Sequence, residues 1–142
     1  MPHATITVVP LSREHFDAVA EIERASGGGS LVALTAGHAL AELLERGHEA
    51  YVALDEGRVV AWAWFTVTLE RGGENVGVVQ RLASTEGHVD AALQLLGHVR
   101  EALALHRCAR ARATLAGDDA ASRELFVRAG FVVDAVTMEL EL

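Results

Sequence analysis

The order of apolar and polar residues predicts helices and strands along the whole chain. Residues 4–9 alternate as a short strand does, and Pro10 closes the run. A helix is expected next, because Ser12 is a suitable N-cap for the apolar stripe that follows it. That stripe consists of Phe16, Val19, Ala20 and Ile22. A second helix is expected over residues 35–46, after a Gly-rich connector at residues 27–30.

A β-hairpin is the clearest predicted feature in the middle of the chain. Two β-rich runs flank the turn residues 55–57, where a glycine supplies the positive φ that a tight turn needs. Alternation places Trp62 and Trp64 on one face of the second run and Phe65 on the other. Both faces of this run are apolar, which is typical of an interior strand.

The second half of the chain continues this alternation of helices and strands. A turn at residues 71–75 leads to a strand at 76–83, and a regular helix is expected over 89–105. Its predicted apolar positions are Val89, Ala92, Leu93, Leu96, Val99 and Leu103. A half-buried strand at 108–115 and a last strand at 131–142 flank a helix that begins at an Asp118 cap and ends at Gly130.

This order of elements predicts one domain over residues 1–142. Its class is α/β, in the broader α+β sense, with a single mixed and mostly antiparallel sheet flanked by helices. A chain of 142 residues is long enough to bury the core of such a fold.

Composition narrows the class of function. The chain has 20 acidic and 12 basic residues and a net charge of −8, which argues against a general nucleic-acid surface or an anionic membrane partner. All the basic residues are arginine, so chemistry that needs a lysine is excluded. The longest apolar run is too short to cross a membrane and the N-terminus lacks a signal pattern, so we expect a soluble, cytoplasmic protein.

Cysteine and histidine usage predicts neither a disulfide nor a metal site. Cys108 is the single cysteine, and we expect it to be a buried structural residue. The chain has seven histidines but no HExxH or CxxC spacing. No metal ion is therefore expected.

Three segments together resemble a known family. Residues 51–65, YVALDEGRVVAWAWF, look like a central hairpin in which Ala61 stands where a glycine is common. Residues 118–131, DDAASRELFVRAGF, are similar to a late-helix pattern, and residues 134–142 look like a last strand. The late-helix positions are Asp119, Ser122, Leu125, Phe126, Gly130 and Phe131. The family is the GCN5-related N-acetyltransferase superfamily, and the resemblance covers nearly the whole chain.

The resemblance implies a cosubstrate, acetyl-CoA or another acyl-CoA, in a gap between two splayed central strands. Its pyrophosphate would bind the strand-to-helix turn STEGHVDAAL, because a helix N-terminus offers unpaired N–H donors and a partial positive charge. The residues expected to bind it are Leu82, Ser84, Thr85, Gly87, His88, Val89, Asp119 and Phe126.

The turn departs from the family's pattern, which leaves two interpretations open. Only Gly87 is kept, and His88 and Asp90 occupy positions where the family usually has glycine. A bulky ring would crowd a phosphate, and a carboxylate competes for the same helix dipole. In the alternative interpretation Ser84 or Thr85 merely caps the helix and no ligand is involved.

The catalytic positions also depart from the family's pattern. The family's acid, a tyrosine of the late helix, is replaced by Phe126, which has no proton to give. Glu70 and Glu74 are candidates for the base, although both lie in a Gly-rich turn where a solvated surface charge is the alternative. The segment after residue 131 is short for the family, which would leave the acceptor pocket open or completed by a homodimer.

The sequence therefore favours an N-acyltransferase that moves an acyl group to the amine of a small molecule or peptide. One alternative is a non-catalytic module of the same fold, for ligand binding or dimerisation. Another is an unrelated α/β fold with a chance match at the late helix.

Overall fold

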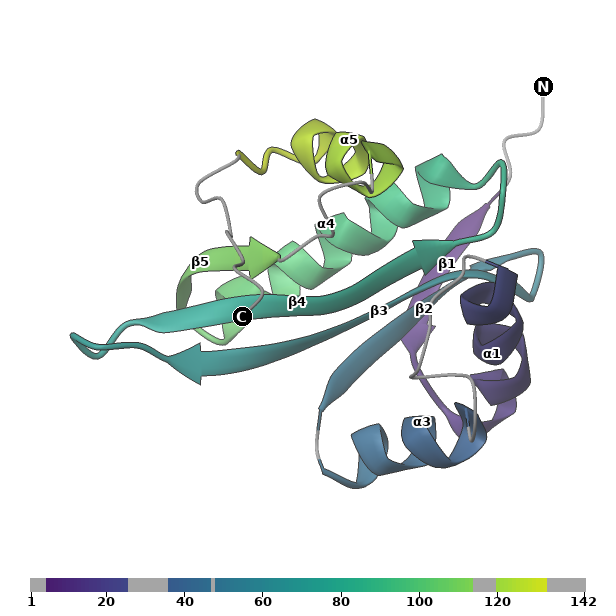
Figure 1. The fold of residues 1–142 in the computed structure, drawn as a ribbon, viewed down its shortest axis with the longest axis horizontal. Helices are drawn as coiled ribbons and strands as arrows, with labels where there is room; N and C mark the ends of the chain where they lie inside the picture. The colour runs from purple at the N-terminus through teal and green to yellow at the C-terminus, as the bar shows by residue number, and fades with distance from the viewer. Residues whose placement is uncertain (1–4, 26–35, 47, 114–119, 133–142) are drawn as a thin grey trace, which may run out of the picture.

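The computed structural model describes residues 5–25, 36–46, 48–113 and 120–132 (Figure 1). The elements are β1 (Ile6–Pro10), η1 (Arg13–His15), α1 (Phe16–Ala25), α3 (Ala36–Glu45), β2 (Glu49–Asp55), β3 (Arg58–Leu69), β4 (Asn75–Ser84), α4 (Val89–Leu105), β5 (Cys108–Ala113) and α5 (Ala120–Arg128). Their order agrees with the predicted one. The predicted Gly-rich connector, the Asp118 cap and the last strand lie outside the described residues.

The strands form one sheet in the order β1-β2-β3-β4-β5. Neighbouring strands are antiparallel except β4 and β5, which are parallel, so the predicted mixed, mostly antiparallel sheet is confirmed. Helices α1 and α3 cover one face of the sheet, while α4 and α5 lie on the other (Figure 1). No helix among the described residues is both long and apolar enough to cross a membrane.

The central hairpin forms as predicted. Glu56 and Gly57 have φ values of 51° and 81°, as a two-residue type I′ turn requires. Trp62 is fully buried in the core on the α1 side with Trp64 packed against it, whereas Phe65 is buried on the α4 side. β3 is the middle strand of the described sheet, which explains why both of its faces are apolar.

Strand β4 contains a bulge at Gln80 that the sequence did not reveal. Trp64 is paired with Arg81 and Phe65 with Val79, so Gln80 has no partner residue on β3. As a result Val79 and Leu82, which are three residues apart, both pack into the core on the α4 side. In a regular strand two residues at that spacing would face opposite sides of the sheet.

In the second half, one burial prediction was wrong, and the buried face of α4 differs in part from the apolar positions of the sequence. The side of α4 that packs on the sheet includes Ala91 and Leu95, whereas Val89 is 44% exposed and Leu93 is only half-buried. The cause is that the stripe is rotated toward Ala91 and Leu95, and Val89 stands in the first turn beside the end of the sheet. Strand β5 is exposed at four of its six residues rather than half-buried, because it is the last strand of the described sheet.

Helix α5 ends at Gly130, as predicted. Gly130 has a φ of 102° and donates to the carbonyl of Val127 at 3.0 Å, while Phe131 donates to the carbonyl of Phe126 at 2.9 Å. These two bonds form a Schellman motif. The rings of Phe126 and Phe131 meet edge to face at 5.0 Å, which supplies the hydrophobic contact that accompanies this motif.

Candidate functional site

The candidate site begins where β4 separates from β5. Strand β5 pairs with Asn75–Val79, here called the paired half of β4. The open half is Gln80–Ser84, in which Arg81–Ser84 pair with β3 on one side and Gln80 is the bulged residue. Within the described part of the chain no strand pairs with the open half on its other side.

The open half leads into the turn at residues 85–88, which is held against β3. The Thr85 amide donates to the carbonyl of Val60 at 2.8 Å, and the His88 amide donates to the carbonyl of Thr85 at 3.2 Å. Gly87 has a φ of 83°, which a glycine adopts at little cost. Gly87 therefore allows the tight backbone path of this turn.

The alternative interpretation, in which Ser84 or Thr85 caps α4, is wrong in this respect. The N-cap is His88, which makes no side-chain capping bond, and Ser84 is the last residue of β4. The helix begins only at Val89, so both hydroxyls lie too far ahead of its first turn to accept from it. The first bond within the helix joins the Ala92 amide to the His88 carbonyl at 3.2 Å, which leaves the earlier amides without a partner inside the helix.

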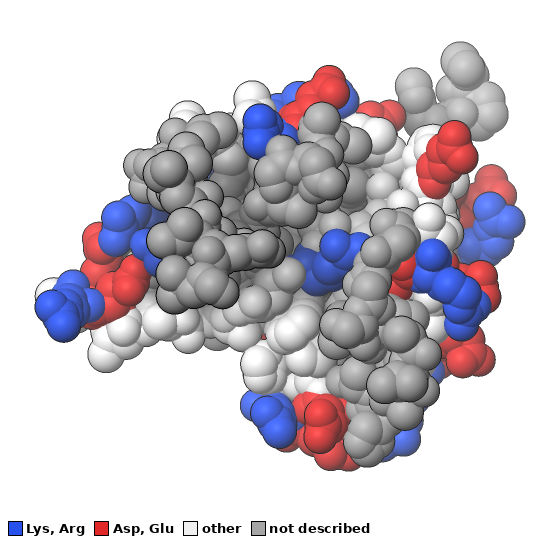
Figure 2. Space-filling view, viewed as in Figure 1, with Lys and Arg blue, Asp and Glu red and all other residues white. Residues whose placement is uncertain are grey.

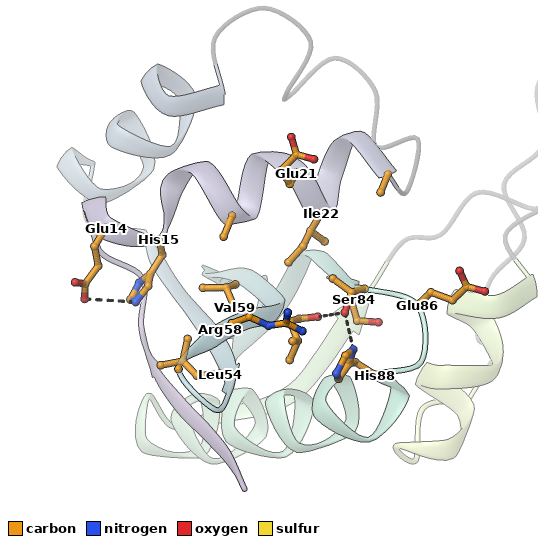
Figure 3. A pocket seen from close by; sticks show the side chains of 15 residues that line it. Glu14, His15, Glu21, Ile22, Leu54, Arg58, Val59, Ser84, Glu86 and His88 are labelled. Carbon is orange, nitrogen blue, oxygen red and sulfur yellow. Dashed lines mark hydrogen bonds and ion pairs between the residues drawn. The ribbon is translucent and has the colours of Figure 1, made fainter. Parts of the chain in front are cut away.

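The His88 side chain is turned toward the hairpin (Figure 3). Its Nε2 lies 3.3 Å from Oδ2 of Asp55, at the end of β2, and its Nδ1 lies 2.7 Å from the Thr85 hydroxyl. In the strand order, β2 and β3 lie on one side of β4 and β5 lies on the other. The ring is therefore directed away from the gap between β4 and β5.

An open groove lies beside this turn, between α1 and the end of the β2–β3 hairpin (Figure 3). Its volume is about 1230 Å³. The side chains of Ile22, Leu54 and Val59 give it an apolar lining, and charged side chains such as Glu21 and Arg58 also border it. The groove gives a ligand access to the turn from the α1 side.

A buried polar cluster on the α1 side anchors the open half of β4. Glu23 is only 1% exposed, and its Oε1 accepts from Nε1 of Trp62 and from Nε of Arg81, both at 2.7 Å. Sequence reasoning missed this cluster. A signal was present, because Glu23 follows Val19 and Ala20 on the apolar stripe of α1 at helical spacing.

The predicted binding residues lie in different surroundings. The structure brings Ser84, Thr85, Gly87 and His88 together in and next to the turn, and Val89 follows them at the start of α4. Leu82 and Phe126 are instead buried in the core on the α4 side. Asp119 lies outside the described residues.

The two candidate bases, Glu70 and Glu74, lie at the opposite end of β4 from the turn. Glu70 pairs with Arg112 and Glu74 with Arg110, each at 2.9 Å. A strand rises by roughly 3.3 Å per residue, which places the start of β4 about 15 Å from the bulge at Gln80. This geometry favours the alternative, a pair of surface ion pairs that joins the β3–β4 turn to β5.

Tyr51 lies on the α4 face of β2 and is packed by aromatic rings. Its ring stacks on Phe65 at 6.0 Å and meets the ring of His98 at 4.6 Å. Burial raises the pKa of the Tyr51 hydroxyl, and the nearby carboxylate of Glu49, which accepts from it at 3.3 Å, raises it further. Tyr51 is therefore a poor proton donor near neutral pH.

In the part of the chain that the structure describes, no group of three or more His, Cys, Asp or Glu side chains is arranged to hold a metal ion.

Comparison with known proteins identifies solved structures that share this fold. No protein-family model matches the chain, and no curated protein matches it by sequence. Solved structures do match. An aminoglycoside N-acetyltransferase in complex with CoA is 13% identical, with a TM-score of 0.80 over 99% of this chain and 97% of that one.

Two further structures cover 97% of this chain and 100% of their own. One is a ribosomal-protein-alanine N-acetyltransferase from Brucella melitensis, with 15% identity and a TM-score of 0.77. The other is described as a transcriptional regulator from Bacillus halodurans, with 12% identity and a TM-score of 0.80. The chain therefore has the fold of the GCN5-related N-acetyltransferases.

Proposed function

We propose that this chain is an acyl-CoA-dependent N-acyltransferase that moves an acetyl or similar acyl group to an amine. The observation that carries the proposal is the separation of β4 from β5 at the Gln80 bulge, directly before the Gly87 turn and α4. An extended acyl-CoA arm would pair with the open half of β4 as an added strand does. Its pyrophosphate would then reach the amides at the start of α4.

The orientation of His88 removes one objection to this proposal. A ring at a position where the family usually has glycine would block the phosphate if it pointed into the gap. Here its Nε2 is within bonding distance of Asp55 on the hairpin, and its Nδ1 is within bonding distance of Thr85 in the turn itself. Asp90 remains an unfavourable charge in the first turn of α4, and it is expected to weaken binding without preventing it.

The proposed reaction is a direct attack of the neutral amine on the thioester carbonyl. The C–N bond forms, the C–S bond breaks, CoA leaves as a thiolate, and the proton of the amine passes to water. Phe126 supplies no proton, but a thiol has a pKa of about 8.5, so the thiolate can leave without a dedicated acid. Glu70 or Glu74 would have to give up its arginine partner and act about 15 Å along β4. The acceptor is an amine of a small molecule or a peptide.

Calorimetric titration with CoA and with acetyl-CoA tests the cosubstrate. Binding in the micromolar to low millimolar range is expected, and no heat at millimolar ligand would refute the proposal. Turnover is then measured as thiol release over a panel of amines. Cys108 adds at most one equivalent of background thiol, and its reaction is slow because burial raises the pKa of its thiol.

A non-catalytic module of the same fold is the second candidate. Phe126, buried in the core where the family often has a tyrosine, favours it. The structure described as a transcriptional regulator also has this fold. Binding of CoA without thiol release on any amine of the panel would support this candidate over the enzyme.

A further inference from the structure

Three side chains form a continuous path from the tip of the hairpin to the turn that precedes α4. Asp55 ends β2, His88 is the N-cap of α4, and Thr85 begins the turn. The path runs from Oδ2 of Asp55 to Nε2 of His88 at 3.3 Å, and from Nδ1 of His88 to the Thr85 hydroxyl at 2.7 Å. The Thr85 hydroxyl also lies 3.3 Å from the carbonyl of Val60 on β3.

The partners fix how the hydrogens are placed. An ionised carboxylate only accepts, so Nε2 of His88 carries a hydrogen and donates to Asp55. In the neutral ring, Nδ1 then accepts from the Thr85 hydroxyl. In the charged ring, Nδ1 donates to that oxygen, and the hydroxyl turns to the carbonyl of Val60. The ring keeps the same place in both states, with one O–H rotation between them.

We propose that Asp55 is a positioning residue that acts through His88 and holds the turn in the shape that binds the cosubstrate's pyrophosphate. The proposal rests on the function proposed above. A turn with several glycines can adapt its backbone to a phosphate, but this turn keeps only Gly87. Besides its backbone bonds, this turn depends on side-chain contacts, and Asp55 holds the bulky His88 ring away from the gap between β4 and β5. His88 and Asp55 are 27% and 19% exposed, so their contact is partly shielded from water.

Calorimetric titration with CoA tests this on four proteins. Asp55→Ala should weaken CoA binding about tenfold, the effect of losing a hydrogen bond to a charged group. Asp55→Asn keeps an acceptor for Nε2 and should restore affinity to within about threefold of the wild type. The matched control is Asp17→Ala, at an exposed position on α1, which should bind as the wild type does.

A double-mutant cycle separates positioning from general damage. Asp55→Ala should add nothing in a His88→Ala background, because the path is already broken there. The tautomer of His88, read from long-range ¹H–¹⁵N spectra and assigned by His88→Ala, should show the hydrogen on Nε2. That preference should weaken in Asp55→Ala.

The outcomes distinguish the two proposals. If the wild-type protein binds CoA and the Asp55→Ala variant binds it with equal affinity, the positioning role of Asp55 is overturned. The proposed function would still stand. The positioning role is also overturned if Asp55→Ala lowers CoA affinity as much in the His88→Ala background as in the wild type. Wild-type protein that does not bind CoA removes both proposals, whatever the spectra show.

Discussion

The two halves of β4 have different surroundings, although they belong to one strand. The paired half, Asn75–Val79, is bonded to β3 and β5, and two ion pairs join the β3–β4 turn to β5, at the end of the molecule where charges of both signs gather in Figure 2. The open half, Gln80–Ser84, is bonded to β3 and anchored by Glu23 through Arg81. Stability is therefore expected to depend on packing in the paired half, while the open half needs a side-chain anchor because β5 does not reach it.

The anchor of the open half gives the largest expected effect. Glu23→Ala should lower the free energy of unfolding by about 3 kcal/mol, because it removes one partner of a buried ion pair and leaves Nε1 of Trp62 without its acceptor. Urea denaturation measures this change. Glu21→Ala, which breaks an exposed ion pair with Arg24 on the same helix, is the control and should cost under about 1 kcal/mol. Equal losses in the two variants would show that the anchor is unimportant.

The paired half should instead be sensitive to volume. A Cβ at Gly77 would lie 2.5 Å from both methyl carbons of Leu103 on α4, so Gly77→Ala should cost about 1–3 kcal/mol through overpacking. CoA affinity of the folded variant should not change. Gly97→Ala is the control, since a Cβ there meets nothing within 4 Å and alanine favours the helix by roughly 0.5–1 kcal/mol. A stabilised Gly77→Ala variant would contradict this packing.

The turn after the open half should combine a smaller stability loss with a loss of binding. Gly87→Ala creates no clash, but its φ of 83° costs a residue with a Cβ about 1–2 kcal/mol. We expect CoA affinity to fall as well, because the turn shifts away from its binding shape. Gly130→Ala is strained in the same way, with a φ of 102° at the end of α5, and should lose stability with CoA affinity unchanged. Calorimetry and urea denaturation on both variants check the contrast.

The structural features that depend on residues close together in the sequence were mostly predicted. The α4 boundaries, the central hairpin and the Gly130 stop all follow from signals within a few residues of each other. Helical spacing also places Glu23 on the apolar stripe of α1. The burial of its carboxylate was nevertheless not predicted.

Features that depend on contacts between distant segments were not predicted. The contact between His88 and Asp55 joins residues 33 apart in the chain and exists only because the strand order brings the hairpin tip beside the turn. The bulge at Gln80 leaves the sequence of β4 looking like a regular strand. The direction of the His88 ring follows from that contact with Asp55 and from its contact with Thr85.

The smallest expected effect concerns Asp90. It distinguishes a turn that binds pyrophosphate from one that only begins a helix. Asp90 lies in the first turn of α4, where its charge interacts favourably with the helix dipole. Asp90→Asn should therefore cost about 0.3–1 kcal/mol of stability. If the same amides bind a pyrophosphate, removing that charge should tighten CoA binding several-fold, and the gain should shrink at high salt. Asp17→Asn, in the first turn of α1, should lose similar stability with no change in affinity. An Asp90→Asn variant that is less stable but binds CoA no better would mean that Asp90 only stabilises the helix, and the pyrophosphate would have to lie elsewhere on the open half of β4.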